Sequence, residues 1–345
     1  MTDGKLNITV LTAEDSLKVF RMTQERVDAA LERFPEFKDK VNISIIRTST
    51  SFENTPSWNA DDYVKFRKGV AEADIMIGYM FPLEEVRAAA PRLKWIHIIG
   101  AGVEHLLPLN WLPEDAVLTN NRGAHAPKSF EYVMMALLML ANHMPRLMRA
   151  QQTHVWDGHF VSIIKGSTVA ILGAGHQGAA AALAAKTLGL RTIGVDIDTT
   201  PRENFDELIH ASRLHEALGR ADYVVVTLPS TDDTYRMIND EAFAAMKDGC
   251  GFVNISRGRI VDSDALIENL ENGRLSGAVL DVFEQEPLPA DSPLWDAPNL
   301  VMSPHMGCDD EENYIHRTFD IFFSNLRRFI AMETLENVVD RVKGY

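Results

Sequence analysis

Cysteine is nearly missing from this 345-residue chain, which contains only Cys250 and Cys308. Two cysteines can form at most one disulfide, so we expect no disulfide framework and a reducing compartment. Positive charge is also scarce, because 34 Lys and Arg face 49 Asp and Glu, and the net charge is −15. An acidic chain is not attracted to phosphate backbones or anionic membranes, so we expect no nucleic-acid partner.

Long apolar runs and targeting signals are missing as well. The most apolar stretch, residues 133–141, is too short to cross a bilayer. The first residues lack the basic and apolar segments of a secretory signal. The hydrophobic share of 46%, the charged share of 24%, the 21 glycines and the 15 prolines are ordinary for globular proteins. We therefore expect a cytoplasmic protein without a membrane segment, and the length favours two domains of about 100 to 200 residues each.

Short apolar strands alternate with amphipathic helices along the chain, which is typical of parallel sheets covered on both faces. In the first 120 residues the pattern predicts strands at 6–11, 41–46, 74–77, 95–99 and 117–119, and helices at 16–31, 61–71 and 83–90. After a long predicted helix at 127–144, strands are predicted at 168–172, 191–196, 223–228, 251–254, 278–281 and 300–302. A last helix is predicted at 312–331, with a packing partner in either domain. These patterns predict two doubly wound α/β domains that meet near Asn120, with a cleft between them.

A glycine-rich loop follows the strand predicted at 168–172. Gly173, Gly175 and Gly178 form a GxGxxG motif that runs into an alanine-rich helix. In a strand–loop–helix unit the first glycine permits a tight turn, the second allows a pyrophosphate to approach the backbone, and the third lets helix and strand pack closely. The helix N-terminus then favours the phosphates. This loop predicts a dinucleotide site, although three glycines can also serve only to make a tight turn.

The end of the next predicted strand favours one cofactor over another. Asp196 lies 18 residues after Gly178, where a carboxylate can accept hydrogen bonds from the adenosine ribose and repel a 2′-phosphate. This position favours NAD over NADP. Arg202 follows closely and could in principle bind such a phosphate, so NADP stays open as the alternative.

Charged side chains follow three predicted strands in an apolar context. Arg257 comes after 251–254, Glu286 after 278–281 and His305 after 300–302. Because open parallel sheets bind ligands at the carboxyl ends of their strands, we expect all three at one ligand-binding edge. A surface arginine, a turn acid and a core histidine are the ordinary alternatives for each residue taken alone.

The glycine loop and three further motifs together resemble the D-isomer-specific 2-hydroxyacid dehydrogenases over nearly the whole chain. The motifs are NISRGRIVD at 254–262, DVFEQEPLP at 281–289 and SPHMG at 303–307. The resemblance implies that His305 gives and takes the proton, that Glu286 pairs with His305 and that Arg257 binds the substrate. Glu284 is a tempting choice for the acid, but the family's acid directly precedes the proline, as Glu286 does. The implied catalytic residues are thus Arg257, Glu286 and His305.

The same resemblance implies the domain roles and the softer contacts. A flavodoxin-like substrate-binding domain would span 1–120 and be completed by 310–345, and a Rossmann NAD-binding domain would span 121–309. The substrate carboxylate would meet the backbone of Gly100, Ala101 and Gly102. The implied cofactor contacts are Gly173, Gly175, His176, Gln177, Gly178, Asp196, Leu228, Pro229, Thr234, Ile255, Ser256, Asp281 and Gly307.

The implied activity is the interconversion of a small 2-oxo acid and its D-2-hydroxy acid with NAD(H), and glyoxylate-like or hydroxypyruvate-like substrates are the first expectation. Two alternatives stay open, a phosphoglycerate dehydrogenase and an NAD(H)-sensing corepressor on the same fold. The histidines and cysteines show no spacing typical of a metal site, so no metal is expected. A homodimer is implied by the family. The segment 128–132 departs from the family's usual sequence at the start of the linking helix, which leaves its contacts undetermined.

Overall fold

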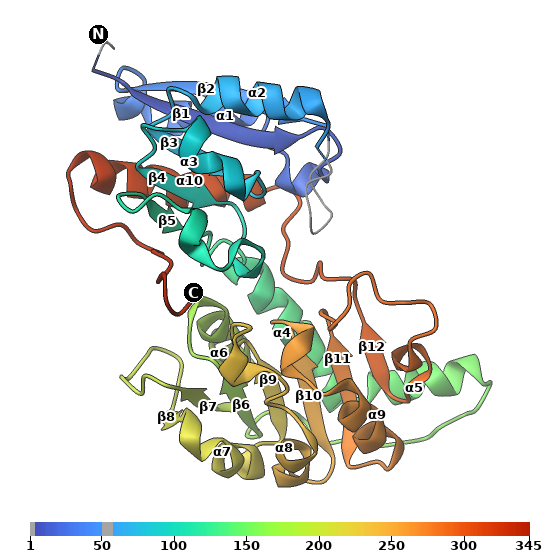
Figure 1. Ribbon diagram of the computed structural model, residues 1–345. Helices are drawn as coiled ribbons and strands as arrows, with labels where there is room; N and C mark the ends of the chain where they lie inside the picture. The colour runs from blue at the N-terminus through green and yellow to red at the C-terminus, as the bar shows by residue number, and fades with distance from the viewer. Residues whose placement is uncertain (1–3, 50–57) are drawn as a thin grey trace. The chain divides into compact units, whose positions relative to one another are not determined.

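The computed structural model describes residues 4–49 and 58–345 and divides the chain into two compact α/β units. One unit is built from two separate segments, Met1–Ala124 and Asp310–Tyr345, and is called the split unit below. The other, called the continuous unit, is His125–Asp309. Each unit contains one parallel sheet (Figure 1).

The sheet of the split unit has five parallel strands in the order β2-β1-β3-β4-β5. This is the flavodoxin-like order, in which the direction of winding reverses beside the first strand. The strands are β1 (Leu6–Ala13), β2 (Val41–Thr48), β3 (Ile75–Gly78), β4 (Trp95–Ile98) and β5 (Val117–Thr119). All residues of β3 and β4 are buried, as expected for strands covered on both faces.

Helices from both segments cover this sheet. They are α1 (Gln24–Arg33), α2 (Ala60–Val70), α3 (Val86–Ala89) and α10 (Tyr314–Ile330). The sequence left the partner of the last helix open, and the structure packs α10 in the split unit. The ring of Phe322 on α10 stacks on Trp95 of β4 with centroids 4.8 Å apart. The C-terminal segment therefore supplies part of the core of this unit.

The continuous unit has seven parallel strands in the order β12-β11-β10-β9-β6-β7-β8. They are β6 (Thr168–Leu172), β7 (Arg191–Asp196), β8 (Glu207–His210), β9 (Tyr223–Val226), β10 (Cys250–Asn254), β11 (Leu275–Leu280) and β12 (Leu300–Met302). The helices are α4 (Ala126–Ala141), α5 (Met144–Gln152), α6 (His176–Thr187), α7 (Leu214–Arg220), α8 (Asp240–Ala245) and α9 (Ser263–Glu271). This is the doubly wound order of dinucleotide-binding sheets, extended by β12. The two predicted parallel-sheet domains are confirmed.

The pairing register of the strands in the continuous unit places their C-terminal ends side by side. Leu172 of β6 pairs with Val226 of β9, and Val226 pairs with Asn254 of β10. Asn254 pairs with Leu280 of β11, which in turn pairs with Met302 of β12. The loops that follow these strands therefore start from one row across the sheet, and they carry the glycine motif and the three charged residues singled out in the sequence.

Two local predictions were wrong, and one strand was missed. The helix predicted at 16–31 is a short 3-10 turn, Lys18–Phe20, followed by α1, which begins only after the Thr23 cap. The helix predicted at 127–144 ends at Ala141, because His143 adopts a left-handed φ of 50° before α5 begins with a proline in its first turn. Strand β8 was missed, since its four residues at the sheet edge show no clear alternation.

Within residues 4–49 and 58–345, the helices are all too short or too polar to cross a membrane.

Candidate functional site

The glycine loop connects β6 to α6, and its three glycines are needed for different reasons. Gly173 has a φ of 95°, which residues with a side chain rarely adopt. A Cβ on Gly178 would overlap the carbonyl of Gly173, so this glycine lets the helix pack against the turn. Thr227, which sequence analysis did not single out, donates its hydroxyl to the carbonyls of Leu172 and Gly173, at 3.0 and 2.8 Å.

Gly175 is different, because no protein contact requires a glycine there. A Cβ on this residue would meet no atom within 4 Å, and its φ of −73° is accessible to any residue. The open space lies at the N-terminus of α6, where His176 and Gln177 form the first turn and the helix favours anions. The space suits a pyrophosphate that approaches the backbone closely, so these residues fit a bound dinucleotide.

Asp196 ends β7 beside this loop and already has several partners. Its carboxylate accepts the N–H of Ala174 at 2.7 Å and the N–H of Asp198 at 3.0 Å. The guanidinium of Arg202 lies 3.3 Å from the same carboxylate and also donates to the carbonyl of Ala174 at 2.6 Å. Arg202 therefore links the acidic strand end to the glycine loop, which the sequence did not predict.

The second terminal nitrogen of the Arg202 guanidinium donates to the Asp198 carboxylate at 2.9 Å. The hydroxyl and the N–H of Thr200 donate to the Asp198 carboxylate, at 2.6 and 2.9 Å. The hydrogen bonds from Thr200, together with that from Arg202, lower the pKa of Asp198 to about 2. Arg202 is thus engaged by two carboxylates, Asp196 and Asp198.

The other predicted cofactor contacts follow the neighbouring strands. Leu228 and Pro229 lie in the loop after β9, and the buried Thr234 donates its hydroxyl to the Pro229 carbonyl at 2.7 Å. Ile255 and Ser256 follow β10 and are buried. All of these residues lie in loops after β9 and β10.

His305 and Glu286 form a close pair. The Nδ1 atom of His305 lies 2.6 Å from Glu286 Oε2, and the backbone N–H of Phe283 donates to the other carboxylate oxygen of Glu286 at 2.8 Å. The Nδ1 contact leaves Nε2 as the ring nitrogen that can face a reactant. Glu284, the tempting alternative acid, instead lies 3.5 Å from Arg236.

The two partners shift each other's pKa. Burial lowers the pKa of His305, but the hydrogen bond and the charge of Glu286 outweigh burial and leave this pKa above its ordinary value. Burial raises the pKa of Glu286, but the hydrogen bond and charge of His305 lower it overall. The pair therefore favours imidazolium beside carboxylate.

Arg257 follows β10, next to the strand whose loop carries Glu286. Its guanidinium donates to the Ser256 carbonyl at 2.8 Å. The positive charge of Arg257 acts on both His305 and Glu286, opposing imidazolium and favouring carboxylate. The structure thus brings the three sequence-predicted charged residues into one electrostatic cluster at the strand ends.

Asp281, the first residue after β11, is buried, with 1% of the residue exposed. Burial raises the pKa of this carboxylate, against hydrogen bonds from Ser303, Gly307 and Met306. The predicted cofactor contacts Asp281 and Gly307 are therefore in direct contact with each other, with the Gly307 N–H 2.9 Å from the carboxylate.

The predicted substrate loop, Gly100 to Gly102, follows β4 in the split unit. The side-chain amide of Asn120 donates to the Ala101 carbonyl at 2.7 Å, and the backbone N–H of Asn121 donates to the Gly100 carbonyl at 2.9 Å. A Cβ on Gly100 would lie 2.6 Å from the ring of Tyr79, so the glycine allows this ring to pack against the loop.

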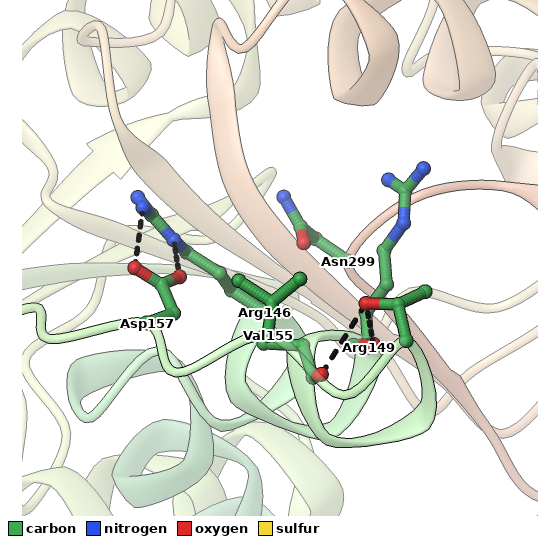
Figure 2. Close-up of a pocket in the computed structure, with 7 residues that line it drawn as sticks. Arg146, Arg149, Val155, Asp157 and Asn299 are labelled. Carbon is green, nitrogen blue, oxygen red and sulfur yellow. Dashed lines mark hydrogen bonds and ion pairs between the residues drawn. The ribbon is translucent and has the colours of Figure 1, made fainter.

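A depression elsewhere on the continuous unit is not this site. It has a volume of about 360 Å³ and is lined by Arg146, Arg149, Ala150, Thr153, Val155, Asp157 and Asn299. Figure 2 shows Arg146 and Asp157 facing each other across part of it, joined by hydrogen bonds of 2.6 and 3.1 Å. No predicted cofactor or substrate residue lines this depression. In the part of the chain that the structure describes, no group of three or more His, Cys, Asp or Glu could hold a metal ion.

The chain is similar to known proteins over most of its length. Residues 134–307 match the NAD-binding domain of the D-isomer-specific 2-hydroxyacid dehydrogenases. A glyoxylate reductase of Korarchaeum cryptofilum is 30% identical over 282 residues, which cover 79% of this chain and 84% of the relative.

Two solved structures are similar over nearly the full chain. A D-isomer-specific 2-hydroxyacid dehydrogenase of Xanthobacter autotrophicus Py2, in complex with NADPH and MES, has a TM-score of 0.80 and 27% identity, and the match covers 98% of this chain and 99% of that one. An NADPH-dependent glyoxylate/hydroxypyruvate reductase of Sinorhizobium meliloti, in complex with NADP and sulfate, has a TM-score of 0.79 and 28% identity, with 98% and 100% covered.

Proposed function

The chain belongs to the family of D-isomer-specific 2-hydroxyacid dehydrogenases, and from that premise we propose that it reduces a small 2-oxo acid, glyoxylate or hydroxypyruvate in type, to the D-2-hydroxy acid. The observation that carries the proposal is the His305–Glu286 pair, at 2.6 Å, in the loops that follow adjacent strands of the dinucleotide-binding sheet. A proton donor at this sheet edge is what reduction of a carbonyl needs.

Each residue of the cluster has a distinct role in the proposal. The bound dinucleotide would supply the hydride to the carbonyl carbon. His305 gives the proton to the carbonyl oxygen from Nε2, because its Nδ1 is held by Glu286. Glu286 stabilises imidazolium and orients the ring. Arg257 binds the substrate carboxylate with its planar guanidinium and polarises the ketone.

We assign substrate binding also to the split unit, as the domain that spans 1–120 and is completed by 310–345. Gly100, Ala101 and Gly102 would offer backbone N–H groups to the substrate carboxylate. The carbonyls of Gly100 and Ala101 are held by Asn121 and Asn120, which supports a fixed loop. Fixed donors bind a carboxylate better than mobile ones because less ordering is needed on binding.

The preferred cofactor in this proposal is NAD(H). Asp196 presents a carboxylate at the end of β7, where the 2′-phosphate of NADP would meet a like charge. Arg202, the residue that could bind such a phosphate, is engaged by Asp196 and Asp198 at 3.3 and 2.9 Å. The two similar structures described above contain NADPH or NADP, so the cofactor is the point where this chain is proposed to differ.

We further propose a cytoplasmic homodimer. The segment after α5 exposes large apolar side chains, with Trp156 at 99%, Phe160 at 98% and Ile163 at 80% exposure. Exposed aromatic clusters of this kind are typical of surfaces that bind another protein chain. Both cysteines are free and buried, which fits a reducing compartment.

The test is NADH oxidation with a panel of 2-oxo acids: glyoxylate, hydroxypyruvate, pyruvate, phenylpyruvate, 2-oxoglutarate and 3-phosphohydroxypyruvate. We expect turnover with a small acid and a loss of about 10² to 10⁴ in kcat for His305→Ala. His215→Ala, at an exposed position of α7, is the matched control and should keep the wild-type rate. NADH binding without turnover of any acid in the panel would refute the proposal and favour a sensor.

A further inference from the structure

The loop Ser303–Gly307, which carries His305, makes four of its hydrogen bonds to Asp281. The Asp281 carboxylate accepts the hydroxyl of Ser303 at 2.6 Å and the N–H groups of Met306 and Gly307, at 3.0 and 2.9 Å. The backbone carbonyl of Asp281 accepts the N–H of His305 at 2.7 Å. Asp281 therefore determines where the loop lies on the sheet.

The backbone of His305 needs such support. Its φ of 49° is in the left-handed region, which is disfavoured for residues with a Cβ. A conformation of this kind persists only where the surroundings impose it. The position of the imidazole opposite Glu286 thus depends on the contacts of the whole loop.

Tyr132, on α4 and 171 residues away in sequence, adds a second hold on the same loop. Its phenolic oxygen lies 2.5 Å from Ser303 Oγ. The single hydroxyl proton of Ser303 is used for Asp281, so Tyr132 must donate and Ser303 accept. Burial raises the pKa of Tyr132 to about 12, against the hydrogen bond to Ser303, so the phenol keeps its proton at neutral pH.

The ring of Tyr132 also covers the end of the loop. A Cβ on Gly307 would overlap this ring, so the glycine lets Tyr132 lie against the backbone. Tyr132 is only 8% exposed and packs in the core cluster that includes Cys308, the residue after Gly307. Hydroxyl and ring thus contact the loop on both sides of His305.

We propose that Tyr132 is a positioning residue for His305, and that the hydrogen-bonded chain Tyr132–Ser303–Asp281 holds the loop so that the imidazole meets Glu286. The inference rests on the proposed function, because it takes His305 as the proton donor. It assigns to α4 a part in the acid–base chemistry, in addition to its part in the core.

The experiment compares Tyr132→Phe, Ser303→Ala and the double variant. Tyr132→Phe keeps the ring and loses the hydroxyl, and we expect kcat to fall about three- to tenfold, the usual effect of one hydrogen bond, with little change in the KM for NADH. Since both substitutions break one chain, the double variant should be no slower than Ser303→Ala. Tyr223→Phe, at a half-buried tyrosine of β9, is the control and should keep the wild-type kcat.

A second measurement does not need turnover. In protein with ¹³C-labelled histidine rings, the His305 signal is identified by its loss in His305→Ala, and its titration is followed by NMR. We expect a lower pKa for His305 in Tyr132→Phe, because a displaced imidazole makes a poorer hydrogen bond to Glu286. The lower pKa should also shift the high-pH limb of the kcat–pH profile of Tyr132→Phe to lower pH. If Tyr132 had a purely structural role, the substitution would lower only the unfolding midpoint.

An unchanged kcat and an unchanged His305 titration in Tyr132→Phe would overturn the inference, and so would independent, multiplicative losses in the double variant. Neither result affects the proposed function, which is decided by wild-type turnover and by His305→Ala. Conversely, if the wild type turns over no 2-oxo acid, the proposed function fails, and the NMR titration still decides whether Tyr132 positions the imidazole.

Discussion

Arg202 pairs directly with Asp196, the residue proposed to bind the adenosine ribose, with 3.3 Å between guanidinium and carboxylate. The arginine that could bind a 2′-phosphate is thus held by the acid that would repel it. Asp198, at 2.9 Å, adds a second carboxylate to the same guanidinium. We therefore expect the choice of cofactor to depend on these three side chains.

This dependence predicts the result of Asp196→Ser. The ribose loses a charged hydrogen-bond acceptor, so kcat/KM with NADH should fall by about 10- to 100-fold. Release of Arg202 should raise kcat/KM with NADPH, and the added substitution Arg202→Ala should abolish that gain. Asp248→Asn, an exposed position, is the control. If the gain with NADPH persists without Arg202, the arginine has no role in the discrimination.

In the glycine loop we expect Gly175→Ala to affect cofactor binding and Gly178→Ala to affect stability. Gly175→Ala should leave the free energy of unfolding within about 0.5 kcal/mol, because the added Cβ meets nothing. It should weaken NADH binding about tenfold or more, since the methyl group enters the proposed pyrophosphate space. Gly178→Ala should instead destabilise the fold by about 1 to 3 kcal/mol, because its Cβ overlaps the Gly173 carbonyl.

Thermal unfolding and fluorescence titration with NADH distinguish these effects. Unaltered NADH binding in Gly175→Ala would show that the open space is not used by the cofactor, and a loss of stability in that variant would contradict the expectation that its Cβ meets no atom.

The pH dependence follows from the His305–Glu286 pair. Reduction needs imidazolium, so kcat/KM for the 2-oxo acid should fall as the pH rises through the pKa of His305, which lies above its ordinary value of 6.5. Glu286→Gln removes the interaction that raises this pKa and leaves the effect of burial. The high-pH limb of the profile should then move to lower pH.

Glu284→Gln is the matched control, since Glu284 lies two residues away and contacts Arg236 instead. It should leave the limb in place. A limb that moves equally in both variants would mean that general charge near the loop, and not the paired carboxylate, sets the pKa of His305.

If the exposed aromatic segment forms the dimer interface, polar substitutions in it should give a monomer. Trp156→Ser with Phe160→Ser removes two nearly fully exposed rings, each worth about 1.5 to 3 kcal/mol when buried in an interface. The dimer dissociation constant should therefore rise by at least on the order of 100-fold. Light scattering after gel filtration measures the mass, with Val342→Ser, an equally exposed apolar residue, as control. A monomeric wild type would disprove the dimer.

Sequence patterns were enough for features that depend on residues close together in the chain. The turn after β6, the acid at the end of β7 and the positions of most strands along the chain are local features, and the structure places the three charged residues at the carboxyl edge as expected. The roles of these residues stay predictions.

Contacts between distant segments were not predictable in this way. Nothing near Tyr132 indicates that its hydroxyl meets Ser303, because helix α4 and the loop after β12 come together only in the folded sheet. A buried phenol must find a partner, but periodicity does not say which one. A shorter-range contact was also missed: the sequence singled out Arg202 as a possible phosphate ligand but did not predict its engagement by Asp198, four residues earlier.

The discontinuous sequence of the split unit has a consequence for folding during synthesis on the ribosome. Ile315, Phe319, Phe322 and Phe323 belong to the same apolar cluster as Ile8, Ile75 and Trp95, yet they are translated some 220 residues after Trp95. The continuous unit has all its strands before that point and can fold from its own residues. The nascent first segment meanwhile lacks the helix that completes this cluster, and we expect chaperones to bind the apolar surface left exposed until α10 is synthesised.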